Sequence, residues 1–290
     1  MRLHWDWLHP VMRVPYVPTL GPVHPREAVP ALFQRVFDIA DSGEFLPQDR
    51  DARWFAAKDE HVLTKAVLHD PDTTLIPTLS TRGKGAVKVI CYTGPCETAV
   101  DLAAELAQAH GTPRARIVWF QAPDHEPAPG AGATRIQLRD FTHPAPHPGG
   151  VRPYSELPPA VAATFADFAD KLSGDGFAFL HEQMKADRVG PVLTVTQDQH
   201  IVGAIGPMET GPDSTGSTRL QPQYFGVLPD QRGHGHGRRL WQAAMHWGRT
   251  YSAEYQLLQT EVGGASDRLC QAEGLTSLGF VCVRDVAQPA

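Results

Sequence analysis

The chain has 290 residues, of which 42% are hydrophobic and 20% charged, and its formal net charge is −6. This length predicts about two domains, and the composition excludes a disordered chain. The mild negative charge excludes a general attraction to nucleic acid. The sequence has no apolar run of about 18 residues, which excludes a membrane-spanning helix.

The cysteines and the first ten residues indicate the compartment. Three of the four cysteines lie in apolar segments and none has the spacing of a zinc site, which predicts buried free thiols; they are Cys91, Cys96, Cys270 and Cys282. Residues 1–10 contain tryptophans, histidines and Asp6 in place of a basic and then an apolar run, so we expect no signal peptide. Both features favour the reducing cytoplasm.

The first half of the chain predicts an α/β lobe over residues 1–145. An extended arm over 1–22 precedes a helix with the apolar stripe Leu32, Phe33, Val36 and Phe37. The elements that follow are predicted as a helix over 51–69, strands over 73–80 and 86–93, a helix over 96–110, and strands over 116–121 and 134–141.

A proline- and glycine-rich segment over 142–153 predicts a linker, so we place a second domain at 150–290. Its predicted elements are helices over 159–172 and 177–186, strands over 192–196 and 201–208, and a polar, mobile loop over 211–218. After these come strands over 255–262 and 281–284, with a short helix from about Ser266 between them.

The most informative stretch, 224–248, predicts a strand, a tight turn and a helix. Tyr224, Phe225, Val227 and Leu228 suit a buried strand that Pro229 ends. Glycines at 233, 235 and 237 let backbone N–H groups approach an anion, and the helix that begins near His236 adds its positive end. Arginines at 232, 238 and 239 add positive charge.

This chemistry predicts a phosphate-bearing ligand where the helix starts. The alternative is a glycine-rich surface loop with solvated arginines. No Gly-Lys-Ser/Thr follows the turn, so it is not a P-loop, and it lacks the spacing of a dinucleotide fingerprint. His234 and His236 also lie in this turn; we interpret them as loop residues and predict no metal site.

Val227-x-Pro229 followed by Arg232-x-x-Gly235-x-Gly237 resembles the pyrophosphate-binding signature of the GNAT N-acyltransferase superfamily. The strand over 255–262, the short helix and Leu278-Gly279-Phe280 resemble a second signature of that family, its closing turn. The resemblance covers about 150–286. It implies an α/β GNAT fold, a mixed and mostly antiparallel sheet flanked by helices. The element order of the N-terminal lobe suggests a degenerate GNAT-like repeat in a tandem arrangement; an unrelated α/β domain is the alternative.

The resemblance also implies roles for individual residues. The strands that contain Val227 and Thr260 would splay apart and admit the pantetheine arm of acetyl-CoA or another acyl-CoA, the donor substrate. A backbone N–H near Val227 or Leu228 would polarise the thioester carbonyl. The pyrophosphate would bind to the turn, which comprises Arg232, Gly233, His234, Gly235, His236, Gly237 and Arg238.

Proton transfer is where the sequence departs from the family. Glu261, at the end of the second splayed strand, is the candidate general base, and Glu209 is the reserve. The place of the family's usual tyrosine acid holds Leu275, and the neighbourhood of its usual asparagine holds Asp267 and Arg268. Tyr224 is a substitute acid, although it also suits a role in the core.

These observations predict a cytoplasmic acyltransferase, most simply an acetyltransferase, that acts on an amine of a small-molecule acceptor. Two alternatives stay open. One is an amide-forming GNAT-like transferase with a carrier-protein-bound or tRNA-bound acyl donor; the other is a non-catalytic CoA-binding module, which the missing tyrosine favours. The sequence does not predict the acceptor, the acyl chain or the oligomeric state.

Overall fold

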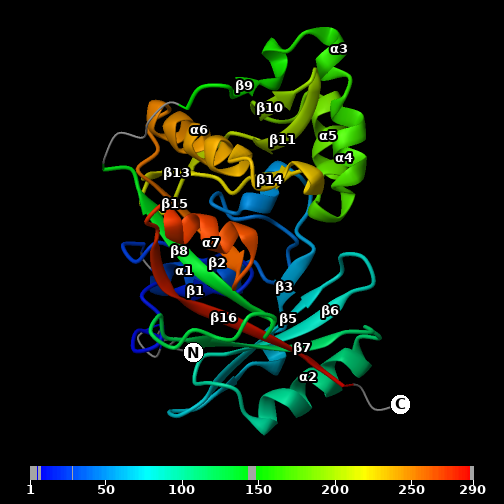
Figure 1. Cartoon of the computed structure of the whole chain (residues 1–290). Helices are drawn as coiled ribbons and strands as arrows, with labels where there is room; N and C mark the ends of the chain where they lie inside the picture. The colour runs from blue at the N-terminus through cyan, green and yellow to red at the C-terminus, as the bar shows by residue number, and fades with distance from the viewer. Residues whose placement is uncertain (1–4, 6–7, 28, 143–147, 288–290) are drawn as a thin grey trace. The chain divides into compact units, whose positions relative to one another are not determined.

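The computed structural model describes residues 5, 8–27, 29–142 and 148–287, and it divides into two compact units (Figure 1). Unit 1 comprises residues 1–138, 213–216 and 257–290, and unit 2 comprises residues 139–212 and 217–256. The domain boundary expected between 145 and 150 stays a prediction. The compact units divide the chain at other positions, and residues 257–290 fold with the N-terminal half.

A mixed sheet forms the body of unit 1, in the order β15-β8-β16-β7-β6-β5-β3. β16 pairs with β7 and β8, and β5 pairs with β3 and β6, all antiparallel, whereas β6 and β7 are parallel. The strands are β3 (Glu60–Val62), β5 (Thr74–Ser80), β6 (Ala86–Cys91), β7 (Ala115–Gln121), β8 (Ala133–Asp140), β15 (Tyr255–Glu261) and β16 (Thr276–Val286). Short β4 (Leu68–His69) pairs with β5, and β1 (Tyr16–Val17) pairs with β2 (Gly21–Pro22).

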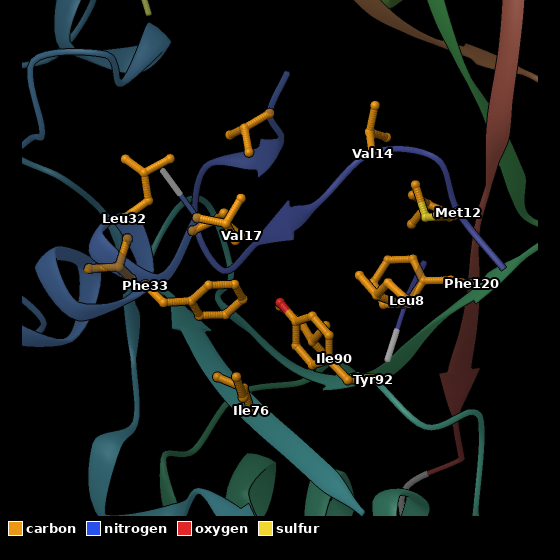
Figure 2. Packing of buried hydrophobic residues seen from close by; sticks show 14 of the residues in the cluster. Leu8, Met12, Val14, Val17, Leu32, Phe33, Ile76, Ile90, Tyr92 and Phe120 are labelled. Carbon is orange, nitrogen blue, oxygen red and sulfur yellow. The ribbon is translucent and has the colours of Figure 1, made fainter. Parts of the chain in front are cut away.

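Helices pack on this sheet because their apolar residues repeat at helical spacing. α1 (Val29–Asp38) buries Val29, Leu32, Phe33 and Val36, as its stripe predicts. α2 (Glu97–Ala109) buries an alanine at every fourth position, which lets it lie close to β6 and β7. α7 (Ala265–Ala272) follows β15. The core joins α1, the sheet and the N-terminal arm, whose Leu8, Met12, Val14 and Val17 lie beside Tyr92 and Phe120 (Figure 2).

Unit 2 contains the sheet β14-β11-β10-β9 and a group formed by β12, β13 and the start of β15. The strands are β9 (Arg152–Pro153), β10 (Leu193–Gln197), β11 (His200–Gly206), β12 (Thr210–Pro212), β13 (Thr218–Leu220) and β14 (Tyr224–Val227). The helices are α3 (Pro159–Ala162), α4 (Phe165–Lys171), α5 (Phe177–Lys185) and α6 (His236–Thr250). Figure 1 shows α6 on one side of this sheet and α4 and α5 on the other. These elements confirm the predicted α/β class.

Short 3-10 turns connect several of these elements. In the part of the chain that the structure describes, they include η2 (Arg50–Arg53), η3 (Thr64–Ala66), η4 (Tyr154–Glu156), η5 (Ser173–Asp175) and η6 (Pro229–Gln231). The helix predicted over 51–69 is wrong: this segment contains η2, β3, η3 and β4. Val62 pairs with Thr78 and is buried, whereas Phe55 is exposed. Pairing along β5 therefore overrides the helical pattern.

Three further expectations need correction. The helix predicted over 159–172 is two helices, because the Thr164 hydroxyl donates to the Val161 carbonyl and accepts from the Ile201 N–H where the chain turns. The loop predicted over 211–218 is partly paired, since β12 and β13 form a hairpin. The predicted closing turn at Leu278-Gly279-Phe280 lies inside β16, at a shift of register between Ser277 and Gly279. Part of the predicted linker, 143–147, lies outside the described residues.

Candidate functional site

The candidate site begins at β14, which is the edge strand of its sheet in unit 2. On its paired side, the Leu228 N–H donates to the Val202 carbonyl at 2.9 Å, and Val227 lies opposite Gly203. Hydrogen-bonded and non-bonded pairs alternate along an antiparallel ladder, so the N–H and C=O of Val227 face the open edge. The expectation of a carbonyl-polarising amide near Val227 or Leu228 therefore narrows to Val227, since the Leu228 amide is engaged by β11.

The strand that follows the helix does not pair with β14. β14 and β15 belong to different sheets. Within unit 2, the side chain of Gln256 in β15 donates through Nε2 to Oε1 of Gln223, which directly precedes β14, at 2.8 Å. The starts of the two strands are therefore joined by a side-chain hydrogen bond and not by backbone pairing. The backbone edge of β14 stays open for an extended ligand.

A glycine turn joins β14 to α6, as the sequence predicts. It runs from η6 through Arg232 to Gly235, and α6 begins at His236. Gly233 and Gly235 have φ of 87° and 77°, a conformation that glycine adopts without strain. A Cβ at either position would have no atom within 4 Å, so the turn has open space around it. The turn and the first amides of α6 can hold an anion.

The charged residues of the turn differ in their surroundings. Arg232 is exposed, and its Nε donates to the Val227 carbonyl at 3.2 Å, so it ties the turn to the open edge of β14. Arg238 is exposed on α6. His234 is exposed with Nδ1 3.3 Å from the Gln231 carbonyl, whereas His236 is buried with Nδ1 2.6 Å from Nη2 of Arg239. The predicted phosphate-binding positions therefore lie in the turn that ends at Gly235 and in the first residues of α6.

The two faces of β14 contact different helices. A Cβ on Gly237 of α6 would lie 3.4 Å from the Phe225 ring, which places Phe225 on the α6 side. Tyr224 and Gly226 point the other way. The Tyr224 ring packs 6.3 Å from that of Phe177 in α5. The close packing of Tyr224 supports a core role; its role as a general acid stays a prediction.

The other proton-transfer candidates lie in separate surroundings. Glu261 is exposed at the end of β15, in the part of that strand that belongs to unit 1. Its role as the general base stays a prediction. Glu209, the reserve, accepts a hydrogen bond from the Gly190 N–H at 3.0 Å through Oε1. Leu275 is 8% exposed, and its N–H donates to the Cys270 carbonyl, so the place of the usual tyrosine holds a packed apolar side chain.

Sequence reasoning missed several residues that shape the site. Gln256 lies in β15 and Gln223 precedes β14, both as ordinary polar residues, and nothing in their spacing predicts that they meet. The sequence indicates only a positive charge for Arg239, yet its guanidinium contacts the ring of His236. Its place three residues after His236 on a helix is the one signal that could have paired them.

No metal-binding or membrane-spanning element is found among the residues that the structure describes. In that part of the chain, no group of three or more histidine, cysteine, aspartate or glutamate side chains could hold a metal ion. Likewise, none of the described helices has both the length and the apolar character required to cross a membrane.

Comparisons with solved structures give distant similarities. A GCN5-related N-acetyltransferase from Sphaerobacter thermophilus is 15% identical, with a TM-score of 0.45 over 83% of this chain and 85% of that chain. A GNAT acetyltransferase from Colwellia psychrerythraea is 9% identical, with a TM-score of 0.48 over 88% and 96%. A tandem GNAT protein from the clavulanic acid biosynthesis pathway is 12% identical, with a TM-score of 0.46 over 89% and 95%.

The family assignment rests on the sequence match rather than on these distant structures. The chain has no match among the curated proteins. Residues 160–270 match the model of the Acetyltransferase (GNAT) family. This range contains β14, the glycine turn, α6 and β15, which are the elements of the candidate site. The C-terminal half of the chain therefore carries a domain of the GNAT acetyltransferase family.

Proposed function

We propose that the chain is an N-acyltransferase that moves an acetyl group from acetyl-CoA to an amine of a small-molecule acceptor. The observation that carries this proposal is the open backbone edge of β14 next to a glycine turn at the start of α6. An extended pantetheine arm can pair with such an edge, and a pyrophosphate can bind to such a turn. The family match supports acyl transfer as the reaction class.

The proposed reaction uses three groups of this chain. The turn Arg232–Gly237 holds the donor by its pyrophosphate. The Val227 N–H donates to the thioester oxygen as negative charge develops there during attack by the amine. Glu261 accepts the proton that the amine must lose, directly or through water. The C–N bond forms and the C–S bond breaks, and the leaving thiolate takes its proton from water or from a substitute acid such as Tyr224, because Leu275 supplies none.

The test of donor binding uses a folded variant of the turn. A side chain on Gly235 would meet no protein atom within 4 Å, but it would occupy the space proposed for phosphate oxygens. At φ of 77°, Gly235→Val costs on the order of 1–2 kcal/mol of backbone strain. We expect calorimetry to show CoA binding to the wild type and a loss of at least about tenfold in the variant, since several amide contacts are displaced.

The test of catalysis is release of CoA from acetyl-CoA in the presence of a panel of amines, with thermal unfolding of each variant as the folding control. Native mass spectrometry of the purified protein identifies any ligand that copurifies. Unchanged CoA affinity in a folded Gly235→Val variant would refute the binding site.

A second candidate function is a CoA-binding module without catalysis. The observation that favours it is Leu275, an apolar residue at the place of the family's tyrosine acid. CoA binding without acetyl transfer to any amine in the panel would support this alternative.

A further inference from the structure

His236 is a buried histidine whose hydrogen bond defines its tautomer. It is the first residue of α6, and only 6% of its surface is exposed. Nδ1 lies 2.6 Å from Nη2 of Arg239. A guanidinium only donates hydrogen bonds, so Nδ1 must accept, and in the neutral ring the proton resides on Nε2. Burial, followed by the charges of Arg239 and His234, lowers the pKa of His236, which agrees with a neutral ring at pH 7.

The other ring nitrogen lacks a partner. Nε2 of His236 is buried and makes no hydrogen bond among the residues that the structure describes. A buried donor without an acceptor costs about 1–3 kcal/mol, and such groups are rare enough in folded proteins that each calls for an explanation. An acceptor supplied by a bound ligand is one such explanation.

The centroid of the His236 ring lies 5.9 Å from that of His234, a residue of the turn proposed to bind phosphate. A side chain on a helix leans toward the N-terminus of that helix, so His236 leans toward Gly235 and Gly233. The two nitrogens of an imidazole point to nearly opposite sides, so the Nε2–H points away from Arg239. The adjoining glycines have open space around them, which leaves the turn room to adjust around a ligand.

We propose that the Nε2–H of His236 donates a hydrogen bond to a pyrophosphate oxygen of the CoA donor and that Arg239 positions the ring for this contact. The proposal rests on the proposed function, because it takes CoA as the ligand of the turn. It adds a side-chain donor to the backbone amides and makes His236 a determinant of donor affinity.

Two substitutions separate the roles of the two nitrogens. In His236→Gln, the side-chain amide N–H takes the place of Nε2–H and can still donate to phosphate. In His236→Asn, the shorter amide oxygen takes the place of Nδ1, so the contact with Arg239 is kept and the donor is lost. We expect His236→Asn to weaken CoA binding by roughly tenfold to a hundredfold, the range for a hydrogen bond to a charged group. We expect His236→Gln to stay within about threefold of the wild type.

Matched controls are available at His200, an exposed histidine of the β10–β11 hairpin with Nδ1 2.7 Å from the Asp198 carbonyl. His200→Asn and His200→Gln should both leave CoA affinity unchanged. Calorimetry is run with CoA and with 3′-dephospho-CoA, which keeps the pyrophosphate, and thermal unfolding confirms that each variant is folded. Equal losses for both ligands in His236→Asn support the pyrophosphate contact.

Three outcomes would overturn the inference. If His236→Asn binds CoA as tightly as the wild type does, the Nε2–H bonds to an ordered water or to no partner. A loss confined to CoA and absent for 3′-dephospho-CoA would place the contact at the 3′-phosphate. Equal losses in His236→Asn and His236→Gln would show that shape, and not the donor, matters. A wild type that binds no CoA contradicts the proposed function instead, so the two failures are distinguishable.

Discussion

At the scale of single residues, the carboxylate of Asp267 in the first turn of α7 accepts several hydrogen bonds within unit 1. It is fully buried, and it accepts from Arg135 Nε at 2.8 Å, Thr260 Oγ1 at 2.9 Å, Gly263 N at 3.0 Å and Gln137 Nε2 at 3.1 Å. These bonds hold the end of β15 to the start of α7. The residue expected near the family's asparagine therefore acts as a structural anchor within unit 1.

Removing this charge should destabilise the protein strongly. Asp267→Asn removes the carboxylate that accepts from Arg135 Nε and leaves the exposed Glu126 as the remaining carboxylate partner of the buried guanidinium, so we expect a loss of about 1.5–3 kcal/mol in the free energy of unfolding, the range for a hydrogen bond to a charged group. The control is Asp285→Asn, which breaks the exposed pair with Arg116 and should cost under about 1 kcal/mol. Urea unfolding at pH 7 measures both. Equal losses in the two variants would contradict the assignment.

The same carboxylate predicts a dependence on pH. Burial alone would raise the pKa of Asp267, but the hydrogen bonds from Arg135, Gly263 and Thr260 outweigh burial and hold its pKa below the ordinary value. A lowered pKa contributes stability that is present above the unfolded pKa of about 3.9 and is lost as pH falls toward the folded pKa. The difference in unfolding free energy between wild type and Asp267→Asn should therefore be constant above about pH 5 and shrink below pH 4. A difference that grows as the pH falls would contradict a lowered pKa of Asp267.

Proton transfer gives a kinetic prediction at the same scale. If Glu261 is the base, Glu261→Gln should lower kcat/KM by ~10²–10⁴-fold, the usual contribution of a general base. The loss should be greatest at low pH, where the amine is protonated.

Leu275→Tyr should raise the rate by under about tenfold, because a thiolate leaves with less help from an acid than an alkoxide does. Profiles of kcat/KM against pH for the three proteins decide this, and a Glu261→Gln profile that overlays the wild type removes Glu261 from the mechanism.

At the scale of elements, β14 has to satisfy two packing faces and one ligand-facing edge. Gly226 lies on the face that meets α4 and α5, where an added Cβ would be 2.7 Å from the Phe177 ring and 2.9 Å from Leu172 Cδ1. A glycine here lets the strand lie close under the helices. The place of β14, and with it the open N–H of Val227, depends on that close approach.

A methyl group on Gly226 should therefore disturb β14. We expect Gly226→Ala to cost about 1–3 kcal/mol in unfolding free energy through overpacking and to weaken CoA binding as the strand moves. Gly149→Ala is the matched control in unit 2, because a Cβ there would meet nothing within 4 Å. Thermal unfolding and calorimetry with CoA test both variants. If Gly226→Ala is as stable as the control, the side chains of Phe177 and Leu172 can move aside without a loss of unfolding free energy, which would contradict the prediction.

At the scale of the whole molecule, the two halves share an order of elements but differ in one connection. β6, α2 and β7 come in the same order as β14, α6 and β15, which supports our proposal that the N-terminal half is a degenerate GNAT-like repeat. In the first half, however, β6 pairs directly with β7, from Val87 with Ala115 to Ile90 with Val118. Around Tyr92 and Phe120, which follow this paired region, the arm residues fill the core (Figure 2).

This difference predicts one CoA per chain. The N-terminal half offers a paired sheet and the turn Thr93-Gly94-Pro95-Cys96, which lacks the arginine and the alternating glycines of the other turn. Leu8, Met12 and Val14 of the arm are fully buried in its core. Calorimetric titration and native mass spectrometry should give a stoichiometry of one. Two CoA per chain, or CoA bound beside Thr93, would refute this.

The sequence by itself determined the elements whose pattern is local. The strand–turn–helix over 224–248 was predicted correctly because proline, alternating glycines and the apolar face of α6 are backbone constraints that hold in any surroundings. The family resemblance followed from the same residues. The strands at 74–80, 86–91 and 115–121 were predicted for a similar reason, since their β-rich apolar runs are bounded by turn residues.

Only the tertiary structure decided how distant segments combine. Long-range pairing placed β16 between β7 and β8, grouped residues 257–290 with the N-terminal half, and turned the predicted helix at 51–69 into edge strands. It also brought Gln256 to Gln223 and, among the residues that the structure describes, left the Nε2–H of His236 without a partner. None of these follows from sequence spacing, because pairing partners and buried hydrogen bonds depend on which surfaces meet, and a chain's local preferences do not specify that.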